Sequence, residues 1–599
     1  MITLIRNLGI FFHSRNELFR TIFLSQSVFL ISSGFELMGI LLLGPLIFLA
    51  TSGEEAMTNE NIIWVYNLFN FNAFESLFLF FFILTISLIL VGVFSSIFSV
   101  TLVSKISTGS GVTLGSRLLS HYISLNWSDI KSTSNTKIIN EIYQESSRVT
   151  ENIFVPFMMI SKSSILCFFI LLGLLYIDPY LTVLFFIFLS SVYFLMYFLF
   201  RAGLYKNSAF LTYAHEQRLL SLSNIFEMFK QIKIWGNAEY FQDHFNQASL
   251  TWGRAYRKNL NVALLPRYFV EASILLAAAT AIYFSAQPGF QFADSLAKTS
   301  IFLFSAFKLL PAIQSLYYSS SQIRGNIYAL ENILSTMSKD NHFELKHKNA
   351  DGNKKDITEI KNISFQNIYF TYPNSDKTSL QNINASFTKD KIYGLTGPSG
   401  AGKSTFCDIL MGLLHQDEGS ILVNGDEVLI YENKLWFKNI SYSPPNPIVI
   451  NDSIQNNIFY KSDDVHDINF LNSLVNLNFL DLEKTEINID SSSLSAGQIQ
   501  RIDLARVFAR IIPSIIILDE PTASLDALNT KNFISNLQEL KQNKIIILVT
   551  HELDLLEMVD SVLIIDDGNL EEYSDISNAI ESSKTFKDLL ASSSKDDNN

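Results

Sequence analysis

The sequence predicts a multi-domain membrane protein in which a six-transmembrane-helix bundle precedes a soluble α/β domain. Three observations lead to this prediction. The length of 599 residues exceeds that of one ordinary core. Hydrophobic residues make up 48% of the chain and charged residues 17%, with 50 phenylalanines, which is unusual for a soluble enzyme. The composition changes near Met337, from long apolar runs to charged and turn-forming residues.

Six apolar runs are each long enough to cross a bilayer as a helix. They are Ile22–Ala50, Leu77–Val103, Ile153–Ile177, Pro179–Phe200, Leu264–Ala286 and Thr299–Tyr318. Asp178 alone separates the third run from the fourth, so these two are expected to form a tight hairpin. One such run could be a buried helix of a soluble protein, but six together indicate a membrane domain.

These patterns divide the chain into five parts. An amphipathic, basic helix at the membrane interface is expected first, then the membrane domain, a polar linker, the α/β domain and a polar tail. The boundaries are 1–21, 22–336, 337–356, 357–582 and 583–599. In the α/β domain, strand and helix patterns alternate, as in a mostly parallel sheet.

Charge is distributed unequally among the predicted loops. Residues 51–76 and 287–297 contain no Lys or Arg, whereas residues 105–148 and 201–258 contain many. Because positive residues stay on the cytoplasmic side, both termini and the α/β domain are predicted to be cytoplasmic, on an inner (plasma) membrane. The basic loops have a helical pattern and are predicted to end in turns near Ser128–Thr136 and Trp235–Phe241. The net charge of −13 argues against a nucleic-acid partner.

A phosphate-binding loop follows the strand-like segment KIYGLT and precedes a helical pattern. It matches G-x-x-x-x-G-K-[ST] in the context that this motif requires. Its backbone N–H groups and the N-terminus of the following helix would bind the phosphates of ATP. Lys403 would reach the β- and γ-phosphates, and the Ser404 hydroxyl would ligate Mg²⁺. The expected nucleotide-binding residues here are Gly397, Pro398, Ser399, Gly400, Ala401, Gly402, Lys403, Ser404 and Thr405.

Two further strand ends supply candidate catalytic groups. Asp519 and Glu520 end the apolar segment IIILDE, and His551 follows the apolar segment KIIILVT. Asp519 is expected to hold Mg²⁺, directly or through water. Glu520 would polarise the attacking water, and His551 would contact the γ-phosphate and orient that water.

The segment LSAGQIQRIDLAR, which precedes the Asp519 strand, resembles the LSGGQ signature of ABC transporter ATPases. With the phosphate loop, Asp519–Glu520, Ser524–Asp526 and His551, it gives the family's motifs in the family's order. The resemblance implies an exporter-type bundle fused to an ATPase domain with a signature-bearing helical subdomain. It also implies that Tyr372 stacks on adenine and that Ser495, Ala496, Gly497, Gln498 and Asp526 contribute to nucleotide binding.

The family mechanism implies a dimer. Two ATPase domains would enclose two ATP molecules, with Ser495, Gly497 and Gln498 of one subunit closing on the γ-phosphate held by the other. One phosphate loop and one signature per chain require a second copy, as a homodimer, or a related half-transporter. The turns near Ser128–Thr136 and Trp235–Phe241 would be the coupling helices that dock on the ATPase domain. ATP binding and hydrolysis would then drive alternating access.

Three positions depart from the family pattern. Pro445 stands where a Gln usually contacts Mg²⁺ and the coupling helices, so either Asn446 or water substitutes or this contact is lost. Residues 488–491 read Asn-Ile-Asp-Ser in place of Gly-Glu-Arg-Gly, and Ala496 replaces the middle Gly of the signature. These changes put the coupling details in doubt and leave the hydrolytic residues in place.

Charges within the predicted membrane helices give the best indication of the substrate, because a charge in a membrane usually lines a cavity or forms a pair. Glu36, Arg267 and Lys308 are the candidates. Arg267 and Glu271, one turn apart, could equally form a self-contained pair, and Lys308 could extend to the interface. The segments PRYFVE and LLPAIQS resemble those of bacterial lipid-linked oligosaccharide flippases. That resemblance implies a polyprenyl-diphosphate sugar, with Arg267 and Lys308 attracting its pyrophosphate.

Two alternatives remain open at this point. One is an exporter of a lipid, a peptide or a drug, which shares the predicted architecture. The other is an ATP-binding regulatory or sensor subunit with little turnover, an idea that Pro445 favours and that Glu520 and His551 oppose.

Overall fold

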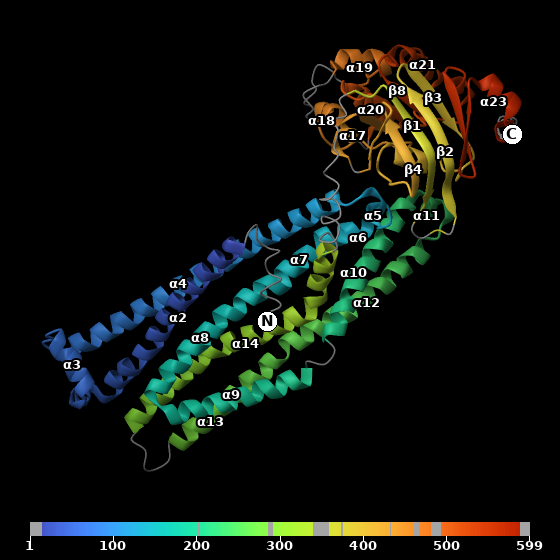
Figure 1. The fold of residues 1–599 in the computed structure, drawn as a ribbon. Coiled ribbons are helices and arrows are strands. Elements are labelled where there is room, and N and C mark those ends of the chain that lie inside the picture. The colour runs from blue at the N-terminus through green and yellow to red at the C-terminus, as the bar shows by residue number, and fades with distance from the viewer. Residues whose placement is uncertain are drawn as a thin grey trace. The chain divides into compact units, whose positions relative to one another are not determined.

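The computed structural model describes residues 15–200, 204–285, 292–338, 359–372, 375, 377–431, 433–460, 466–480 and 493–587. Figure 1 shows its elements. Its contacts divide the chain into two compact units. The first comprises Met1–Leu125 and Ser132–Asn349, and the second comprises Asn126–Lys131 and Ala350–Asn599.

The first unit is helical. Its long helices are α2 (Arg15–Ser52), α4 (Phe74–Ser124), α8 (Val155–Ile177), α9 (Pro179–Phe200), α10 (Leu204–Glu227), α12 (Ala238–Leu264), α13 (Pro266–Ser285) and α14 (Phe292–Ser338). Shorter elements are η2 (Gly53–Thr58), α3 (Glu60–Leu68), α6 (Asn135–Ile139), η3 (Asn140–Glu145), α7 (Ser146–Val149), η4 (Thr150–Phe154) and α11 (Phe229–Trp235). The described residues of each predicted apolar run fall on these helices.

Four stretches among the described residues are long and apolar enough to cross a membrane, which makes this a multi-pass membrane protein. They are Phe19–Met57, Phe74–Ser124, Asn135–Ile177 and Ser300–Met337. The total of six spans stays a prediction. The expected hairpin is confirmed, because α8 ends at Ile177 and α9 begins at Pro179, with the Asp178 carboxylate accepting a hydrogen bond from Leu181 N.

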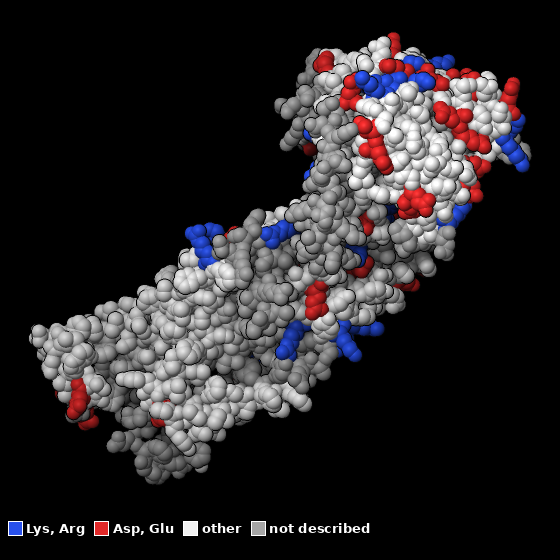
Figure 2. Space-filling model, viewed as in Figure 1, with Lys and Arg blue, Asp and Glu red and all other residues white. Residues whose placement is uncertain are grey.

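The outer surface of the helices is apolar where lipid would contact it. Phe94, Phe194 and Leu275 are exposed, on α4, α9 and α13. On the face seen in Figure 2, a long stretch of the helical unit shows few charged atoms. Large exposed apolar side chains in such numbers are expected of a surface solvated by hydrocarbon rather than by water.

Beyond the apolar runs, the chain turns where the sequence predicts. α11 ends at Gly236, whose φ of +70° is a left-handed conformation that glycine adopts without a Cβ clash. The other turn lies between α5 (Trp127–Lys131) and α6, where Ser134 Oγ accepts a hydrogen bond from Lys137 N and caps α6.

The second unit is built on a six-stranded sheet with the order β10-β9-β3-β8-β7-β6 among its described residues. The neighbouring strands from β6 to β9 are parallel, as predicted, and β10 is antiparallel to β9. A four-stranded antiparallel sheet, β2-β1-β4-β5, was not predicted. The strands are β1 (Asn362–Thr371), β2 (Thr378–Thr388), β3 (Lys391–Thr396), β4 (Glu418–Val423), β5 (Asp426–Glu427), β6 (Ile440–Ser443), β7 (Ile515–Asp519), β8 (Ile545–Val549), β9 (Ser561–Asp566) and β10 (Asn569–Tyr573).

Both faces of the parallel sheet are buried, which explains its uninterrupted runs of isoleucine. Ile515 and Ile517 of β7 pack into the core shared with the antiparallel sheet. Ile516 and Leu518 pack into a second core on the opposite face. Side chains alternate along a strand, so a strand covered on both faces needs an apolar residue at every position.

The helices of this unit are α16 (Lys403–Leu410), α17 (Lys434–Lys438), α18 (Ile454–Phe459), α19 (Ile468–Val475), α20 (Ala496–Ala509), α21 (Ala527–Leu540), α22 (Leu553–Leu556) and α23 (Ile576–Ser582), with α5 packed against them. The packed structure continues past Ser582, because Phe586 is buried in the second core. The predicted interfacial helix up to residue 14, the linker after Ser338 and the tail from residue 588 lie outside the described residues.

Candidate functional site

The carboxyl edge of the parallel sheet collects the predicted catalytic residues. β3, β8 and β7 are neighbours, and their carboxyl ends lead respectively into the phosphate loop, His551 and Asp519–Glu520. Ligands of open α/β sheets bind outside this edge. Segments that are more than 100 residues apart in the sequence therefore meet at one place.

The phosphate loop requires glycine at two positions for lack of space. A Cβ at Gly397 would lie 2.0 Å from Ile565 O, and one at Gly402 would lie 2.7 Å from Ser379 O. Both residues also have positive φ, at +145° and +112°. The loop closes through Ala401 N, which donates to Pro398 O at 3.2 Å, and Gly402 then leads into α16.

Lys403 and Ser404 begin α16, as the motif predicts. The Lys403 ammonium lies within the curve of the loop, where it donates to the carbonyls of Gly397 and Pro398. Burial lowers the Lys403 pKa, while the charges of Glu520 and Asp519 oppose that shift. Ser404 is exposed, and Thr405 is buried. This part of the loop thus presents the ammonium group of Lys403 and the exposed hydroxyl group of Ser404.

Asp519 and Glu520 form a carboxylate pair beside that cation. Burial raises the Asp519 pKa to about 6; the Glu520 charge adds to the rise and Lys403 opposes it. Glu520 has a φ of +49°, and its N–H donates to Val549 O at 2.9 Å, which fixes it against β8. A non-glycine residue in the left-handed region stores strain that is typical of functional sites.

His551 follows β8 and is exposed at the same edge. Its Nδ1 lies 3.4 Å from Thr396 Oγ1, at the end of β3. Burial of part of the ring, together with the Lys403 charge, lowers the His551 pKa. A neutral imidazole, able to donate one hydrogen bond and accept another, is expected at neutral pH.

Tyr372 contacts the phosphate-loop helix and α5. Its hydroxyl lies 3.2 Å from Thr405 Oγ1, and its ring stands edge-on to Phe370. Lys131 of α5 lies over the ring, 5.4 Å from its centroid, and donates to the hydroxyl at 3.4 Å. The position suits an aromatic platform beside the loop, and stacking on adenine stays a prediction.

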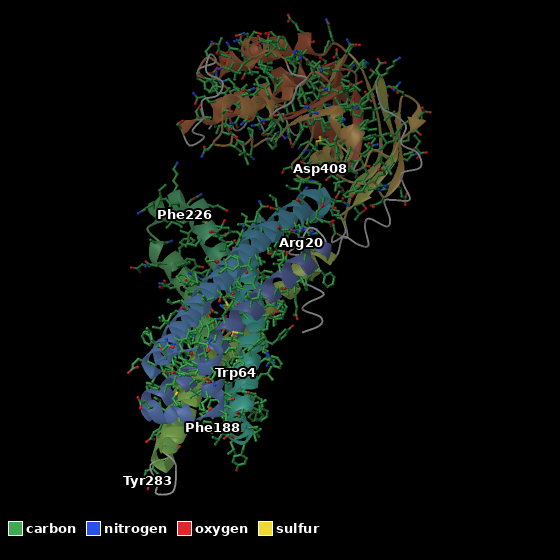
Figure 3. All side chains as sticks on the ribbon, turned by 90° about the vertical axis from the view of Figure 1, so that its left-hand side faces the viewer. Arg20, Trp64, Phe188, Phe226, Tyr283 and Asp408 are labelled. Atoms are coloured by element: carbon green, nitrogen blue, oxygen red, sulfur yellow. The ribbon has the colours of Figure 1, made fainter. Side chains whose placement is uncertain are left out.

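Two residues of α5 contact Asp408 of α16, a residue that sequence reasoning missed and that Figure 3 labels. Trp127 Nε1 donates to Asp408 Oδ2 at 3.4 Å, and Lys131 Nζ lies 3.6 Å from the same oxygen. Asn126 also donates to Tyr431 Oη at 2.7 Å. Burial raises the Asp408 pKa and Lys131 opposes the rise. These contacts lie within the second unit, which includes Asn126–Lys131 and so the first part of the predicted turn near Ser128–Thr136; a coupling role of that turn stays a prediction.

The signature residues form the start of α20. Ser495 Oγ accepts from Gln498 N at 3.3 Å, and Gln498 Oε1 accepts from Ser495 N at 2.8 Å, which is a reciprocal capping box. A Cβ at Gly497 would lie 2.6 Å from Ser524 O, so that glycine is required by packing. Ala496, which departs from the family pattern, is accommodated in the first turn of α20.

Two other positions singled out in the sequence are a helix cap, Asp526, and an exposed loop residue, Pro445. Asp526 caps α21, where its carboxylate accepts from Asn529 N and Asn529 Nδ2, both at 2.8 Å, and the first of these bonds lowers the Asp526 pKa. Pro445 and Asn446 are exposed in the connection after β6. A proline side chain has no atom that can ligate a metal ion. At position 445 the fold therefore offers no substitute for the glutamine that the family usually has there.

In the helical unit, only two of the three candidate substrate residues come together. Lys308 Nζ of α14 lies 3.2 Å from Glu36 Oε2 of α2. Arg267 instead pairs with Glu271 on its own helix at 2.6 Å, and its side chain is 59% exposed. Sequence reasoning missed Lys162 on α8, which donates to Ser96 O at 3.4 Å, while the Ser96 hydroxyl donates to Glu36. A lysine in the middle of the third apolar run was the available signal.

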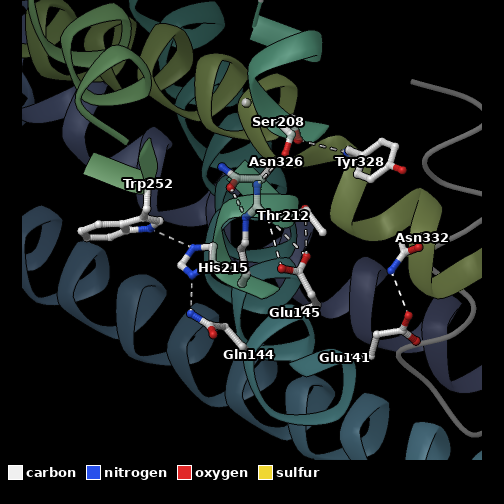
Figure 4. A network of polar contacts seen from close by, with 12 residues as sticks. Glu141, Gln144, Glu145, Ser208, Thr212, His215, Trp252, Asn326, Tyr328 and Asn332 are labelled. Atoms are coloured by element: carbon white, nitrogen blue, oxygen red, sulfur yellow. Dashed lines mark hydrogen bonds and ion pairs between the residues drawn. The ribbon is translucent and has the colours of Figure 1, made fainter. Parts of the chain in front are cut away.

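A second polar cluster in this unit was also missed (Figure 4). Arg148 donates to Glu145 at 3.3 Å, to Asn326 Oδ1 at 2.7 Å and to Thr212 Oγ1 at 2.7 Å. Arg148 and Glu145 are 6% and 0% exposed. Their i, i+3 spacing was visible in the sequence, but the partners on α10 and α14 were not.

Comparison with known proteins defines the class. Residues 380–523 match the ABC transporter family domain. The whole fold matches a bacterial Atm1-family ABC exporter, whose structure was determined with ATP bound. The TM-score is 0.75 at 15% identity, covering 96% of this chain and 99% of that one. The chain therefore has the fold of an ABC exporter half-transporter, with apolar membrane helices and a nucleotide-binding ABC domain in one polypeptide.

Among individual proteins, the chain is similar to ATP-dependent lipid A-core flippases. It is 26% identical to that of Photorhabdus laumondii over 373 residues, which cover 60% of this chain and 62% of the flippase. The match thus spans less than two thirds of that relative. The subtilin transport ATP-binding protein of Bacillus subtilis is 26% identical over 481 residues, covering 74% of this chain and 76% of that protein.

Proposed function

We propose that this chain is an ATP-driven exporter or flippase of an amphipathic substrate, most consistent with a lipid-linked (oligo)saccharide. The observation that carries the proposal is the convergence of Lys403, Asp519–Glu520 and His551 at the carboxyl edge of one sheet. They belong to a chain that also has helices long and apolar enough to cross a membrane. The similarity to lipid A-core flippases supports an amphipathic substrate.

Each residue at the edge has a proposed part in hydrolysis. The phosphate loop and Lys403 bind the phosphates of ATP, and Tyr372 stacks on its adenine. The hydroxyl of Ser404 and the carboxylate of Asp519 are hard oxygen donors that fit Mg²⁺, whose chemistry neutralises developing phosphate charge. Glu520 accepts a hydrogen bond from the attacking water and His551 orients it.

The proposed working unit is a dimer in an inner (plasma) membrane, with the ATPase domain and both termini cytoplasmic. Ser495, Gly497 and Gln498 would complete the phosphate site of the second subunit, which is another copy of this chain or a related half-transporter. The N-terminus of α20 suits that part, because its first backbone N–H groups attract an anion.

Reconstituted protein tests the proposal directly. Wild-type protein in proteoliposomes should hydrolyse Mg-ATP and flip a fluorescent lipid-linked diphosphate sugar. Glu520→Gln should lower hydrolysis about 100-fold or more, as expected for loss of a general base. Glu539→Gln, an exposed carboxylate on α21, is the matched control and should hydrolyse like wild type. Equal hydrolysis by Glu520→Gln and wild type would contradict the assignment.

Mixing two inactive variants tests the dimer. Lys403→Ala disables the phosphate loop, and Ser495→Ala disables the signature. A mixed pair regains one site built from the intact loop of one copy and the intact signature of the other. An equimolar mixture should recover roughly a quarter of the wild-type rate, since half of the pairs are mixed and each has one working site. No recovery in mixtures that demonstrably exchange subunits would reject a shared site.

Pro445 is the one observation that favours a second function, an ATP-binding sensor subunit. Its exposed position after β6 provides no side-chain ligand at the usual glutamine position. ATP binding without measurable turnover, in detergent and in lipid, would favour the sensor. Turnover that depends on Glu520 would reject it.

A further inference from the structure

A cluster of charged and hydroxyl side chains lies where α2, α4, α8 and α14 meet. Glu36 Oε2 accepts from Lys308 Nζ at 3.2 Å, and Glu36 Oε1 accepts from the Ser96 hydroxyl. Lys162 Nζ donates to Ser96 O at 3.4 Å, and the charges of Glu36 and Lys308 both act on Lys162. The three charged groups therefore share one site although they belong to three helices.

Small residues allow the helices to approach closely enough to build this cluster. A Cβ at Gly92 of α4 would lie 3.4 Å from Glu36 Cγ and 3.5 Å from Glu36 Cα. Ser95 donates to Ser32 at 3.3 Å, and Ser96 lies at the same distance from Ser32. The α2–α4 interface beside Glu36 is therefore rich in hydroxyl groups, which can turn their protons toward an acceptor.

The charges of the cluster do not balance. Two ammonium groups stand against one carboxylate, and Glu36 is only 8% exposed while Lys308 is 40% exposed. An excess positive charge within membrane helices is costly unless an anion compensates it. Arg267 and Glu271, the two charged residues of α13, already compensate each other at 2.6 Å. Among the side chains that the structure describes, the cluster thus lacks one negative charge for neutrality.

We propose that Lys162 and Lys308 bind the phosphate group of an amphipathic substrate, with Glu36 as the built-in counter-ion that the phosphate partly displaces. This inference rests on the proposed function and narrows its substrate to lipids with a phosphate or diphosphate head group. A phosphate carries up to two negative charges and several acceptor oxygens, which match two ammonium groups and nearby hydroxyls. A single carboxylate beside two lysines suits neither a metal ion nor a cationic drug.

Direct binding, measured without hydrolysis, tests this site. The full-length protein is placed in phosphatidylcholine nanodiscs with a fluorescent polyprenyl phosphate, and the equally tagged polyprenol is the uncharged control. Wild-type protein should bind the phosphate more tightly than the alcohol. Lys162→Gln should weaken phosphate binding at least about tenfold, as expected for loss of one charge-assisted contact, and leave polyprenol binding unchanged.

Three further variants sharpen the result. Lys162→Arg keeps the charge and should retain most of the affinity. Lys105→Gln, which removes an exposed lysine of α4, should bind like wild type. Glu36→Gln removes the competing carboxylate and should tighten phosphate binding. If Lys162→Gln does not fold, as judged by thermal melting, Lys162→Met replaces it with the same expected loss.

Several outcomes would overturn the proposal. They are unchanged phosphate affinity in a folded Lys162→Gln protein, equal loss for phosphate and alcohol, or weaker binding in Glu36→Gln. Displacement of the tagged lipid by inorganic phosphate alone would show a site for free phosphate instead of a lipid head group. Failure of ATP hydrolysis would reject the proposed function and leave these binding results unaffected, so the two failures are distinguishable.

Discussion

The helical unit contains two clusters of buried charge that differ in how completely they are compensated. Around Arg148, one carboxylate faces one guanidinium, and Asn326, Thr212 and the Ser208 carbonyl accept its remaining hydrogen bonds. Around Glu36, two lysines share one carboxylate, and one lysine side chain is 40% exposed. Charges of the same kinds thus form a closed structural network in one place and an open site in the other. Compensation, more than burial, distinguishes structure from proposed function here.

The largest loss of stability should come from removing Arg148 from the compensated network. Arg148→Met leaves Glu145 buried without its cation, which should cost about 3–5 kcal/mol of unfolding free energy. The thermal transition of the helical unit, followed in detergent, should fall accordingly. Lys206→Met, which changes an exposed lysine of α10, is the control and should shift the transition little. A small shift for Arg148→Met would mean that the network is not structural.

Removing the charges of both Glu145 and Arg148 should lower the unfolding free energy less than removing the Arg148 charge alone. Glu145→Gln combined with Arg148→Met eliminates the orphaned carboxylate and should recover about half or more of the single variant's loss, on the order of 2 kcal/mol. The same thermal transition measures this double-mutant cycle. Strictly additive losses would indicate that the two side chains do not interact.

His215 should make the stability of the helical unit near the Arg148 network depend on pH. Trp252 Nε1 donates to His215 Nε2 at 3.1 Å, and Gln144 Nε2 lies 2.6 Å from His215 Nδ1. Burial, with the charges of Arg148 and Arg218, lowers the His215 pKa to about 4. Because the folded pKa lies below the unfolded value of about 6.5, stability is present above pH 6.5 and lost as pH falls toward 4.

As pH falls from 6.5 toward 4, the protein should lose ~1–2 kcal/mol of unfolding free energy through His215, allowing for partial solvent screening. His215→Gln should flatten the dependence of the thermal transition between pH 6.5 and 4. His244→Gln, which changes an exposed histidine of α12, should leave that dependence as in wild type. An identical pH profile for wild type and His215→Gln would contradict the assignment.

The smallest effect should come from the open site. Lys308→Gln leaves Glu36 beside Lys162 and the Ser96 hydroxyl, so no charge is orphaned. Because the Lys308 side chain is 40% exposed and Glu36 keeps another lysine, the expected cost is about 1 kcal/mol or less. A loss as large as that of Arg148→Met would mean that both clusters are structural and that the comparison fails.

Local motifs made the nucleotide site predictable. The residues from Gly397 to Ser404 are contiguous, and two of their glycines, Gly397 and Gly402, are required by the neighbouring carbonyls of Ile565 and Ser379. Asp519 and His551 were predictable because each ends an apolar strand, and parallel strands bring such ends to one edge. The uninterrupted isoleucine runs likewise indicated a sheet that is covered on both faces.

Pairings between distant segments could not be predicted. Arg148 meets Asn326, and Lys162 meets Ser96, across separations that no local period reveals. The substrate hypothesis joined Arg267 with Lys308, whereas the fold joins Lys308 with Glu36 and leaves Arg267 with Glu271. Phe586 was assigned to a polar tail because one aromatic residue among serines and lysines gives no periodic signal, yet the core includes it.

α16 gives the phosphate loop a short mechanical path to α5. Lys403 opens this helix, and Asp408, five residues later, contacts Trp127 and Lys131. At about 1.5 Å per residue, the two positions are separated by only ~7.5 Å of continuous helix. One uninterrupted helix, with no loop inserted, thus separates the phosphate-binding lysine from the residue that contacts the Trp127 indole.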